Sequence, residues 1–137
     1  MLLAAVLLFL GQESVSAGQS VASVLNGCWE GRDHAGMSAC IETRAKAAAS
    51  SLALAEKLAG EAIRASIDSS GFPSYRSDAL AALKRSSAAF SKYVDDECGY
   101  EASLAVKGNA SEDIRLACQV VLKEGRTERL KNSRPGP

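Results

Sequence analysis

The sequence predicts an all-α protein, a small three-helix bundle with long antiparallel helices and a disulfide-stapled loop. Apolar and small residues recur at steps of three and four over long segments, and no segment has the strict alternation of a half-buried strand. Alanine supplies much of the 47% apolar content while aromatic residues make up 5%, which favours closely packed helices over a bulky sandwich. The length of 137 residues fits one small domain.

The first ten residues, MLLAAVLLFL, are apolar, and the polar stretch GQESVSAGQS follows them. The run is about half of the ~20 residues that a membrane-spanning helix needs, but it suits the core of an export signal. Small residues before position 18 allow cleavage after Ala17, although no Lys or Arg precedes the run. A buried N-terminal helix is the alternative, and the lack of a polar face argues against it.

This pattern predicts the domain organisation and the location of the protein. Residues 1–17 are expected to be a signal peptide that is removed, so the mature form should be periplasmic or secreted and have no membrane span. The remaining parts are an N-terminal arm, the helical domain and a short tail, at residues 18–32, 33–132 and 133–137.

Four cysteines follow the apolar run, and an even count behind an export signal predicts two disulfides. We favour the local pairing, Cys28–Cys40 with Cys98–Cys118; the crossed pairings would tie the arm to the last helix and stay open. A zinc site is the competing interpretation, but the sequence has no C-x-x-C pair and only one histidine, His34. We therefore expect neither a metal nor a cofactor.

Asp33 is a good N-cap for a first helix that begins near His34. One stripe of small and apolar residues, widened by Leu54 and Leu58, continues until the SSGFP stretch breaks it, so this helix should run to about Ser69. The stripe consists of Met37, Ile41, Ala45, Ala48, Leu52, Ala55, Ala59 and Ala62.

A second helix should begin near Ser74 or Ser77 and end at Gly99, which is placed as a left-handed cap. Residues 99–111 are then expected to be a long loop. The inward stripe of the second helix is Leu80, Leu83, Ser87, Phe90 and Val94, with Tyr93 beside it.

Ser111 is the expected N-cap of a third helix, with acidic residues in its first turn. A Cys98–Cys118 bridge would staple the preceding loop, worth roughly 3 kcal/mol on the chain-entropy model. The inward side chains of the third helix are expected to be Ile114, Ala117, Cys118, Val121, Leu122 and Leu130.

The formal net charge is zero, which gives no sign of a nucleic-acid binder. Charge is unevenly spread, however, because residues 92–101 carry four acids and one base. If the second helix ends at Gly99, Asp95, Asp96 and Glu97 lie in its last turn, where the helix dipole disfavours negative charge. This placement suggests a role beyond local helix stability; pairing with basic residues of the third helix is the alternative.

Catalysis finds little support in the sequence. The single histidine has no obvious nucleophile beside it, and the adjacent carboxylates of residues 95–97 point in different directions on a helix. They are poorly placed to flank one glycosidic bond. We therefore expect that the protein is not an enzyme.

Three segments share a pattern with a known family. Cys28 precedes the helix cap in DHAGMSAC, and LKRSSAAFSKYVDDEC and RLACQVVLKEGRTERL supply the aromatic, acidic, basic and cysteine positions. Over about residues 28–131 the chain resembles the lysozyme-inhibitor LprI-like family of small exported helical domains. It departs from that pattern at Ser87, Ala88, Val94 and Lys123, where the family has Gln, Arg, Arg and Thr.

The resemblance implies a protein partner, a lysozyme-like glycoside hydrolase. The loop at 99–111 is expected to block the enzyme's cleft, where Tyr100 or Lys107 could meet the catalytic acids. Trp29 either caps the core or is an exposed anchor. The acids expected to steer association with a basic partner are Asp95, Asp96, Glu97 and Glu101.

Other residues are assigned to the architecture. Phe90 and Tyr93 are expected in the core, and Arg126 is expected to form an ion pair with Asp95 between the second and third helices. Two other functions stay open. One is a structural or self-associating envelope protein that uses the alanine-rich first helix, and the other is an immunity-type protein against a cell-wall-cleaving toxin.

Overall fold

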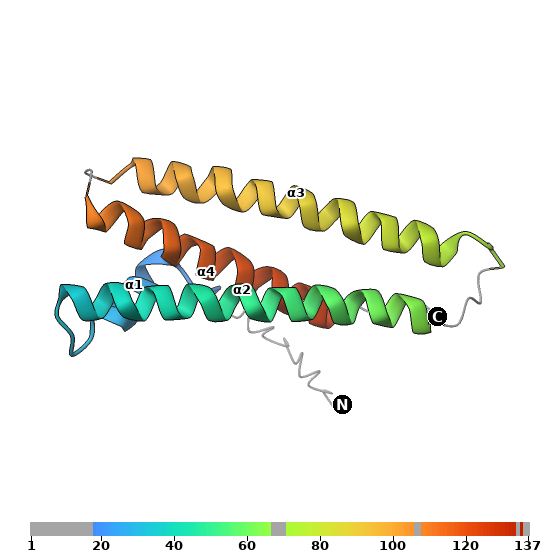
Figure 1. The fold of residues 1–137 in the computed structure, drawn as a ribbon, viewed down its shortest axis with the longest axis horizontal. Coiled ribbons are helices and arrows are strands. Elements are labelled where there is room, and N and C mark those ends of the chain that lie inside the picture. The colour runs from blue at the N-terminus through green and yellow to red at the C-terminus, as the bar shows by residue number, and fades with distance from the viewer. Residues whose placement is uncertain (1–17, 67–70, 106–107, 134, 136–137) are drawn as a thin grey trace, which may run out of the picture.

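A computed structural model describes residues 18–66, 71–105, 108–133 and 135. These residues form helices and no strand, which confirms the all-α prediction (Figure 1). The prediction of three helices is wrong, because four are present in the described ranges. They are α1 (Val21–Trp29), α2 (His34–Ala65), α3 (Tyr75–Ser103) and α4 (Asn109–Asn132).

The additional helix, α1, is closed at its start by a capping box. Ser20 Oγ accepts a hydrogen bond from the Ser23 amide at 3.1 Å, and Ser23 Oγ accepts one from the Ser20 amide at 3.0 Å. Cys28 is buried at the end of a stripe that also contains Val21, Val24 and Leu25. This spacing of i, i+3, i+4 and i+7 is an amphipathic signal that sequence reasoning missed, because a serine replaces the usual Glu or Gln of a capping box.

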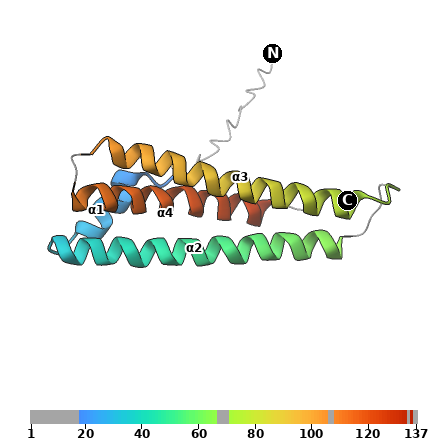
Figure 2. The ribbon, with the colours of Figure 1, turned by 45° about the horizontal axis from the view of Figure 1, so that its top comes forward.

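The two long helices, α2 and α3, run in opposite directions, as predicted (Figure 1). Helix α4 lies beside both and runs in the same direction as α2. Figure 2 shows α1 at one end of the bundle only. We call this the disulfide end, and the opposite end, where α2 stops and α3 starts, the hairpin end.

Helix α2 begins where the sequence predicted. The Asp33 carboxylate accepts a hydrogen bond from the Gly36 amide at 2.8 Å and so satisfies a free donor of the first turn. The preceding Gly31 has φ 69°, a left-handed conformation that turns the chain from α1 into α2. The helix ends at Ala65, earlier than the expected Ser69, which lies outside the described residues.

Helix α3 does not stop at Gly99, and the predicted loop at 99–111 is wrong. The helix continues to Ser103, so the connection to α4 is short. Cys98 and Ala102 are both buried, and the Ser111 hydroxyl donates to the Ala102 carbonyl at 3.0 Å. Packing of this last turn therefore outweighs the tendency of Gly99 to end a helix.

Helix α4 begins at Asn109, two residues before the predicted cap. Its N-cap is Gly108, with φ 147°, and no side chain caps the turn. The hydroxyl of Ser111 is engaged with α3 instead, so the predicted capping role of Ser111 is wrong.

The core is thin and built from small side chains, as the alanine content predicted. Its larger cluster joins α1, α2 and α4, and a smaller cluster of Val94, Cys98 and Cys118 joins α3 to α4. Two disulfides lie within this core, Cys28–Cys40 and Cys98–Cys118, which is the local pairing favoured from the sequence. The larger cluster consists of Val24, Cys28, Ile41, Ala45, Ala48, Ala117 and Val120.

Several apolar residues assigned to the core lie at the surface. Tyr93 is 48% exposed, so its expected place in the core is wrong, whereas Phe90 packs against the smaller cluster. Leu54 and Leu58 are 56% and 52% exposed, and they line an open hollow together with Leu130 of α4. Within the described ranges, no helix is both long and apolar enough to cross a membrane.

Candidate functional site

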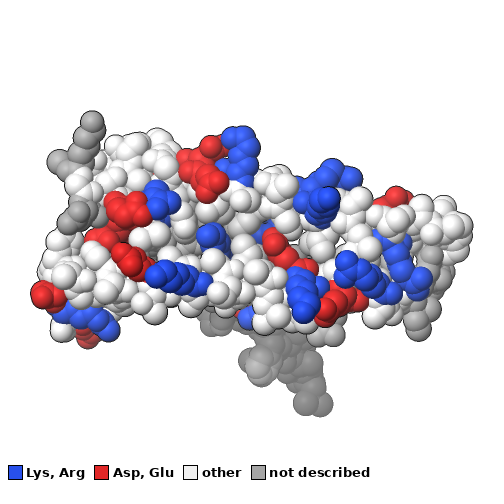
Figure 3. Space-filling model, in the orientation of Figure 1, with Lys and Arg blue, Asp and Glu red and all other residues white. Residues whose placement is uncertain are grey.

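The predicted acidic residues lie on the last three turns of α3, at the disulfide end. Asp95, Asp96 and Glu97 were expected in a final helical turn, but α3 continues past them to Ser103, so the predicted conflict with the helix dipole is absent for these three acids. Glu101 was expected in a loop and instead lies in the last turn of α3. The four acids are at positions 95, 96, 97 and 101 of one continuous helix, and Tyr100 lies between the last two of them. Figure 3 shows acidic side chains more frequent toward this end and basic ones toward the hairpin end.

Helical spacing divides these residues into three directions. The stripe that packs on α4 contains Val94, Cys98 and Ala102, all buried. Asp96 and Tyr100 are four residues apart and exposed, so they share an outward face. The other acids lie on the two sides of that face, Asp95 on one side and Glu97 with Glu101 on the other.

Two ion pairs between described residues lie at this end, one on an outward acid of α3, Asp96, and one on Glu112 of α4. Lys92 Nζ lies 2.6 Å from the Asp96 carboxylate one turn along the helix. This hydrogen bond, with the charge of Asp96, raises the pKa of the Lys92 ammonium above its usual value. On α4, Arg115 Nε donates to Glu112 at 2.8 Å, and this contact lowers the pKa of the Glu112 carboxyl.

Arg126 does not pair with Asp95, and that prediction is wrong. The Arg126 guanidinium joins three helices instead, because Nε lies 3.2 Å from Glu56 Oε1 on α2. Its other two nitrogens donate to the hydroxyls of Ser86 and Ser87 on α3, at 3.2 and 3.1 Å. The guanidinium carbon also lies 4.9 Å from the centre of the Phe90 ring. Arg126 therefore has an architectural role.

The side chain of Asp113 holds α4 against α2 at the disulfide end. It was expected to be an acid of the first helical turn, but it is buried and accepts a hydrogen bond from Ser38 Oγ at 2.9 Å. Sequence reasoning missed this contact, because a serine 75 residues away gives no local signal.

The remaining predicted binding residues, Trp29 and Lys107, do not belong to the acidic part of α3. Trp29 is half-exposed at the end of α1, with its ring centre 6.3 Å from that of His34. This exposure favours the anchor interpretation over the core-capping one. Leu104, just after α3, is also exposed, and sequence reasoning did not select it. Lys107 lies outside the described residues.

The disulfide end presents an acidic and aromatic surface on a stiff support. Cys28–Cys40 clamps the turn between α1 and α2, and Cys98–Cys118 fixes the acidic part of α3 to α4. Such a surface can bind a basic protein with little loss of conformational entropy. In the described part of the chain, no three His, Cys, Asp or Glu side chains are grouped to hold a metal ion.

Comparison with known proteins gave one match. The family model described as lysozyme inhibitor LprI matches residues 28–130, which include all four helix-stapling cysteines. No curated protein and no solved structure matches the chain.

Proposed function

This chain belongs to the lysozyme inhibitor LprI family, and on that basis we propose that it is an exported protein that binds and inhibits a lysozyme-type glycoside hydrolase. The family match over residues 28–130 carries this proposal. The matched range contains the whole of α2, α3 and both disulfides.

The proposed binding surface is the acidic part of α3. Asp95, Asp96, Glu97 and Glu101 lie within two turns, and lysozyme-type enzymes that are strongly basic are attracted by such a field before contact. The Cys98–Cys118 bridge supports this role, because it holds the acids in place before the partner arrives. Electrostatic steering acts mainly on the association rate and weakens as salt is added.

The blocking element is proposed to be the end of α3 and the short turn that follows it. Tyr100 points outward beside the acids, and Leu104 is exposed at the tip. An aromatic ring and an aliphatic side chain can fill a sugar-binding cleft, whose catalytic carboxylates would then lose access to substrate. Lys107 remains a candidate for contact with those carboxylates, and Trp29 a candidate for a second anchor.

A cell-wall lysis assay with the purified mature protein tests the proposal. Reversing Asp96 and Glu101 to lysine should lower the rate of association with a basic lysozyme by about tenfold or more and reduce its salt dependence. The matched control is Asp78→Lys, because Asp78 is also exposed on α3 but lies at the hairpin end. Absence of inhibition by the unaltered protein in the lysis assay would refute the proposed function. Equal association rates for all variants would refute only the proposed surface.

Export is tested separately. If residues 1–17 are a signal peptide, intact-mass measurement of protein from the cell envelope or medium should give a chain that starts at Gly18 with both disulfides formed. Retention of the apolar run, or free thiols on Cys98 and Cys118, would contradict export to an oxidising compartment.

A further inference from the structure

Helix α1 fills only part of the groove between α2 and α4. It buries Val24 and Cys28 there, and its partly buried Val21 and Leu25 pack against the same cluster. Contacts of α1 with both α2 and α4 show that its apolar face is the occupant of this half of the groove. The groove therefore already accepts an amphipathic helix at the disulfide end.

The same groove continues past α1 toward the hairpin end. Arg44 lies under α1, since a Cβ atom on Gly27 would be 3.9 Å from its Nη1. Seven-residue steps keep a position on one face of a helix, and they lead from Arg44 to Ser51 and then to Leu58. On α4 the equivalent step leads from Glu124 to Lys131.

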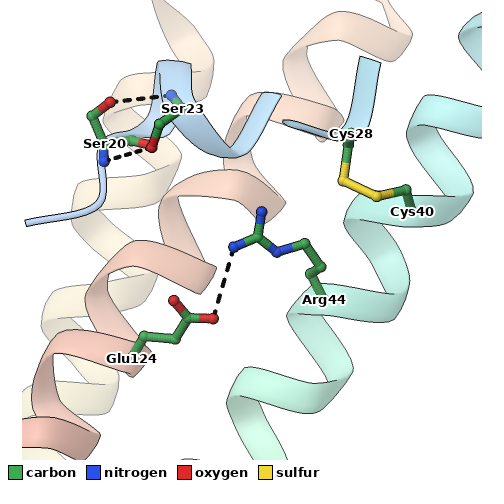
Figure 4. Close-up of polar contacts among 6 residues, drawn as sticks. All are labelled: Ser20, Ser23, Cys28, Cys40, Arg44 and Glu124. Carbon is green, nitrogen blue, oxygen red and sulfur yellow. Dashed lines mark hydrogen bonds and ion pairs between the residues drawn. A yellow bond between two sulfur atoms is a disulfide. The ribbon is translucent and has the colours of Figure 1, made fainter. Parts of the chain in front are cut away.

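Figure 4 shows where the two halves meet. Arg44 and Glu124 reach toward each other from α2 and α4 beside α1, with 4.0 Å between Nη2 and Oε1. Beyond this ion pair the groove is open. It has a volume of about 420 Å³, and its walls include Leu54, Leu58 and Leu130.

The shape and charge of this open half select its occupant. Its lining is mostly apolar, and among the described lining residues Lys131 alone is charged. Lys131 also pairs with Glu128 one turn before it, at 2.9 Å. Of the charged residues in 50–65, 75–87 and 121–132, which form the hairpin end, nine are basic and five are acidic. Arg64 and Arg129 in these segments make no ion pair with another described residue. Neither lines the groove, so they contribute only to the net positive field around it. A partner therefore needs apolar residues on one face and acids beside them.

We propose that the open half of the α2–α4 groove binds an amphipathic, acid-flanked helix of another protein. A second copy of this chain fits less well, because pairing two hairpin ends through Leu54 and Leu58 would bring two basic segments together. A flat membrane fits less well because the apolar surface is concave. This surface lies at the opposite end from the acids of α3, so it adds a second binding site to the proposed inhibitor and does not depend on inhibition.

The test uses two synthetic helical peptides and the oxidised full protein. Both peptides carry Leu at i, i+3, i+4 and i+7; one has Glu at the flanking positions and the other has Lys. We expect fluorescence anisotropy to show binding of the Glu peptide in preference to the Lys peptide. Leu58→Asp should weaken this binding by about tenfold or more, since it places a charge in an apolar site. Lys131→Glu should shift the preference toward the Lys peptide.

Leu104→Asp is the matched control, because Leu104 is also an exposed leucine, 66% against 52% for Leu58, but lies at the disulfide end. Unchanged circular dichroism of the variants shows that folding is intact. The proposal is overturned if neither peptide binds, if both bind equally well, or if Leu104→Asp weakens binding as much as Leu58→Asp. It is also overturned if Leu58→Asp instead abolishes a dimer seen by light scattering, or binding to anionic vesicles, while peptide binding is absent.

Discussion

Removal of the Arg126 side chain should destabilise the bundle more than removal of any other arginine on the last turns of α4. Arg126 is 11% exposed and contacts Glu56 on α2 and two serines on α3, whereas Arg129 is exposed and has no ion pair with another described residue. The matched pair Arg126→Ala and Arg129→Ala therefore separates an interhelical contact from the general loss of an arginine.

The magnitude follows from the contacts that are lost. A hydrogen bond between charged groups contributes about 1.5–3 kcal/mol, and the stacking of a cation on an aromatic ring about 0.5–1 kcal/mol. Glu56 remains 29% exposed, so water can partly replace its partner and the loss is smaller than for a fully buried pair. We expect Arg126→Ala to lower the free energy of unfolding by about 2–3 kcal/mol, and Arg129→Ala by less than about 0.5 kcal/mol.

Urea unfolding followed by far-ultraviolet circular dichroism, with the disulfides intact, measures these values. In a domain of this size the expected loss corresponds to a fall in Tm of about 8–12 °C. A double-mutant cycle of Arg126→Ala with Glu56→Gln should give a coupling energy of about 1 kcal/mol or more, and the cycle with Asp95→Asn should give almost none. Equal effects of the two arginine variants, or stronger coupling to Asp95, would refute the argument.

Three further outcomes are expected. Replacing Cys98 and Cys118 together by alanine should lower the free energy of unfolding by about 3 kcal/mol, measured by denaturant unfolding, and an unchanged midpoint would contradict the chain-entropy estimate. Val120→Ala should lower the free energy of unfolding by about 2 kcal/mol because Val120 is fully buried, and Val121→Ala should lower it by about half as much or less because Val121 is partly exposed. Thermal unfolding measures both, and a larger effect of Val121→Ala would contradict the position of Val120 in the core. Glu112→Gln should cost a few tenths of a kcal/mol at neutral pH, because the carboxylate is 54% exposed and screened. Arg115 lowers the pKa of the Glu112 carboxyl in the folded protein, so this stabilisation is present above the ordinary pKa of 4.5 and should vanish as the pH falls below it. A difference in unfolding free energy between Glu112→Gln and the unaltered protein that persists in acid would contradict this sign.

Several parts of the architecture could be predicted because their signals are local. Asp33 caps α2 as expected, since an N-cap depends on residues within one turn. The disulfide pairing favoured from spacing is also confirmed, since each pair closes a short loop between neighbouring elements, although the crossed pairings stayed open at the level of the sequence. Helix α1 was predictable in principle, but its capping box uses two serines and its stripe is short.

The errors occurred where packing decides between local alternatives. Gly99 is an ordinary helix-ending residue, yet α3 passes through it because the next turn buries Ala102. Asp95 was the predicted partner of Arg126, and the position of α2 beside α4 supplies Glu56 instead. Leu54 and Leu58 match the apolar periodicity of α2, but the sequence contains no sign that α1 covers only one half of the groove.

The amino-acid sequence by itself determined that this protein is helical, alanine-rich and crosslinked twice, because periodicity, composition and cysteine spacing act over one or a few turns. Its similarity to a family of lysozyme inhibitors was also readable from the cysteine frame and the residues beside it. Only the tertiary structure decided which charges pair, where α3 ends and which apolar side chains stay exposed. These features depend on contacts between residues tens of positions apart, and no short segment of sequence encodes them.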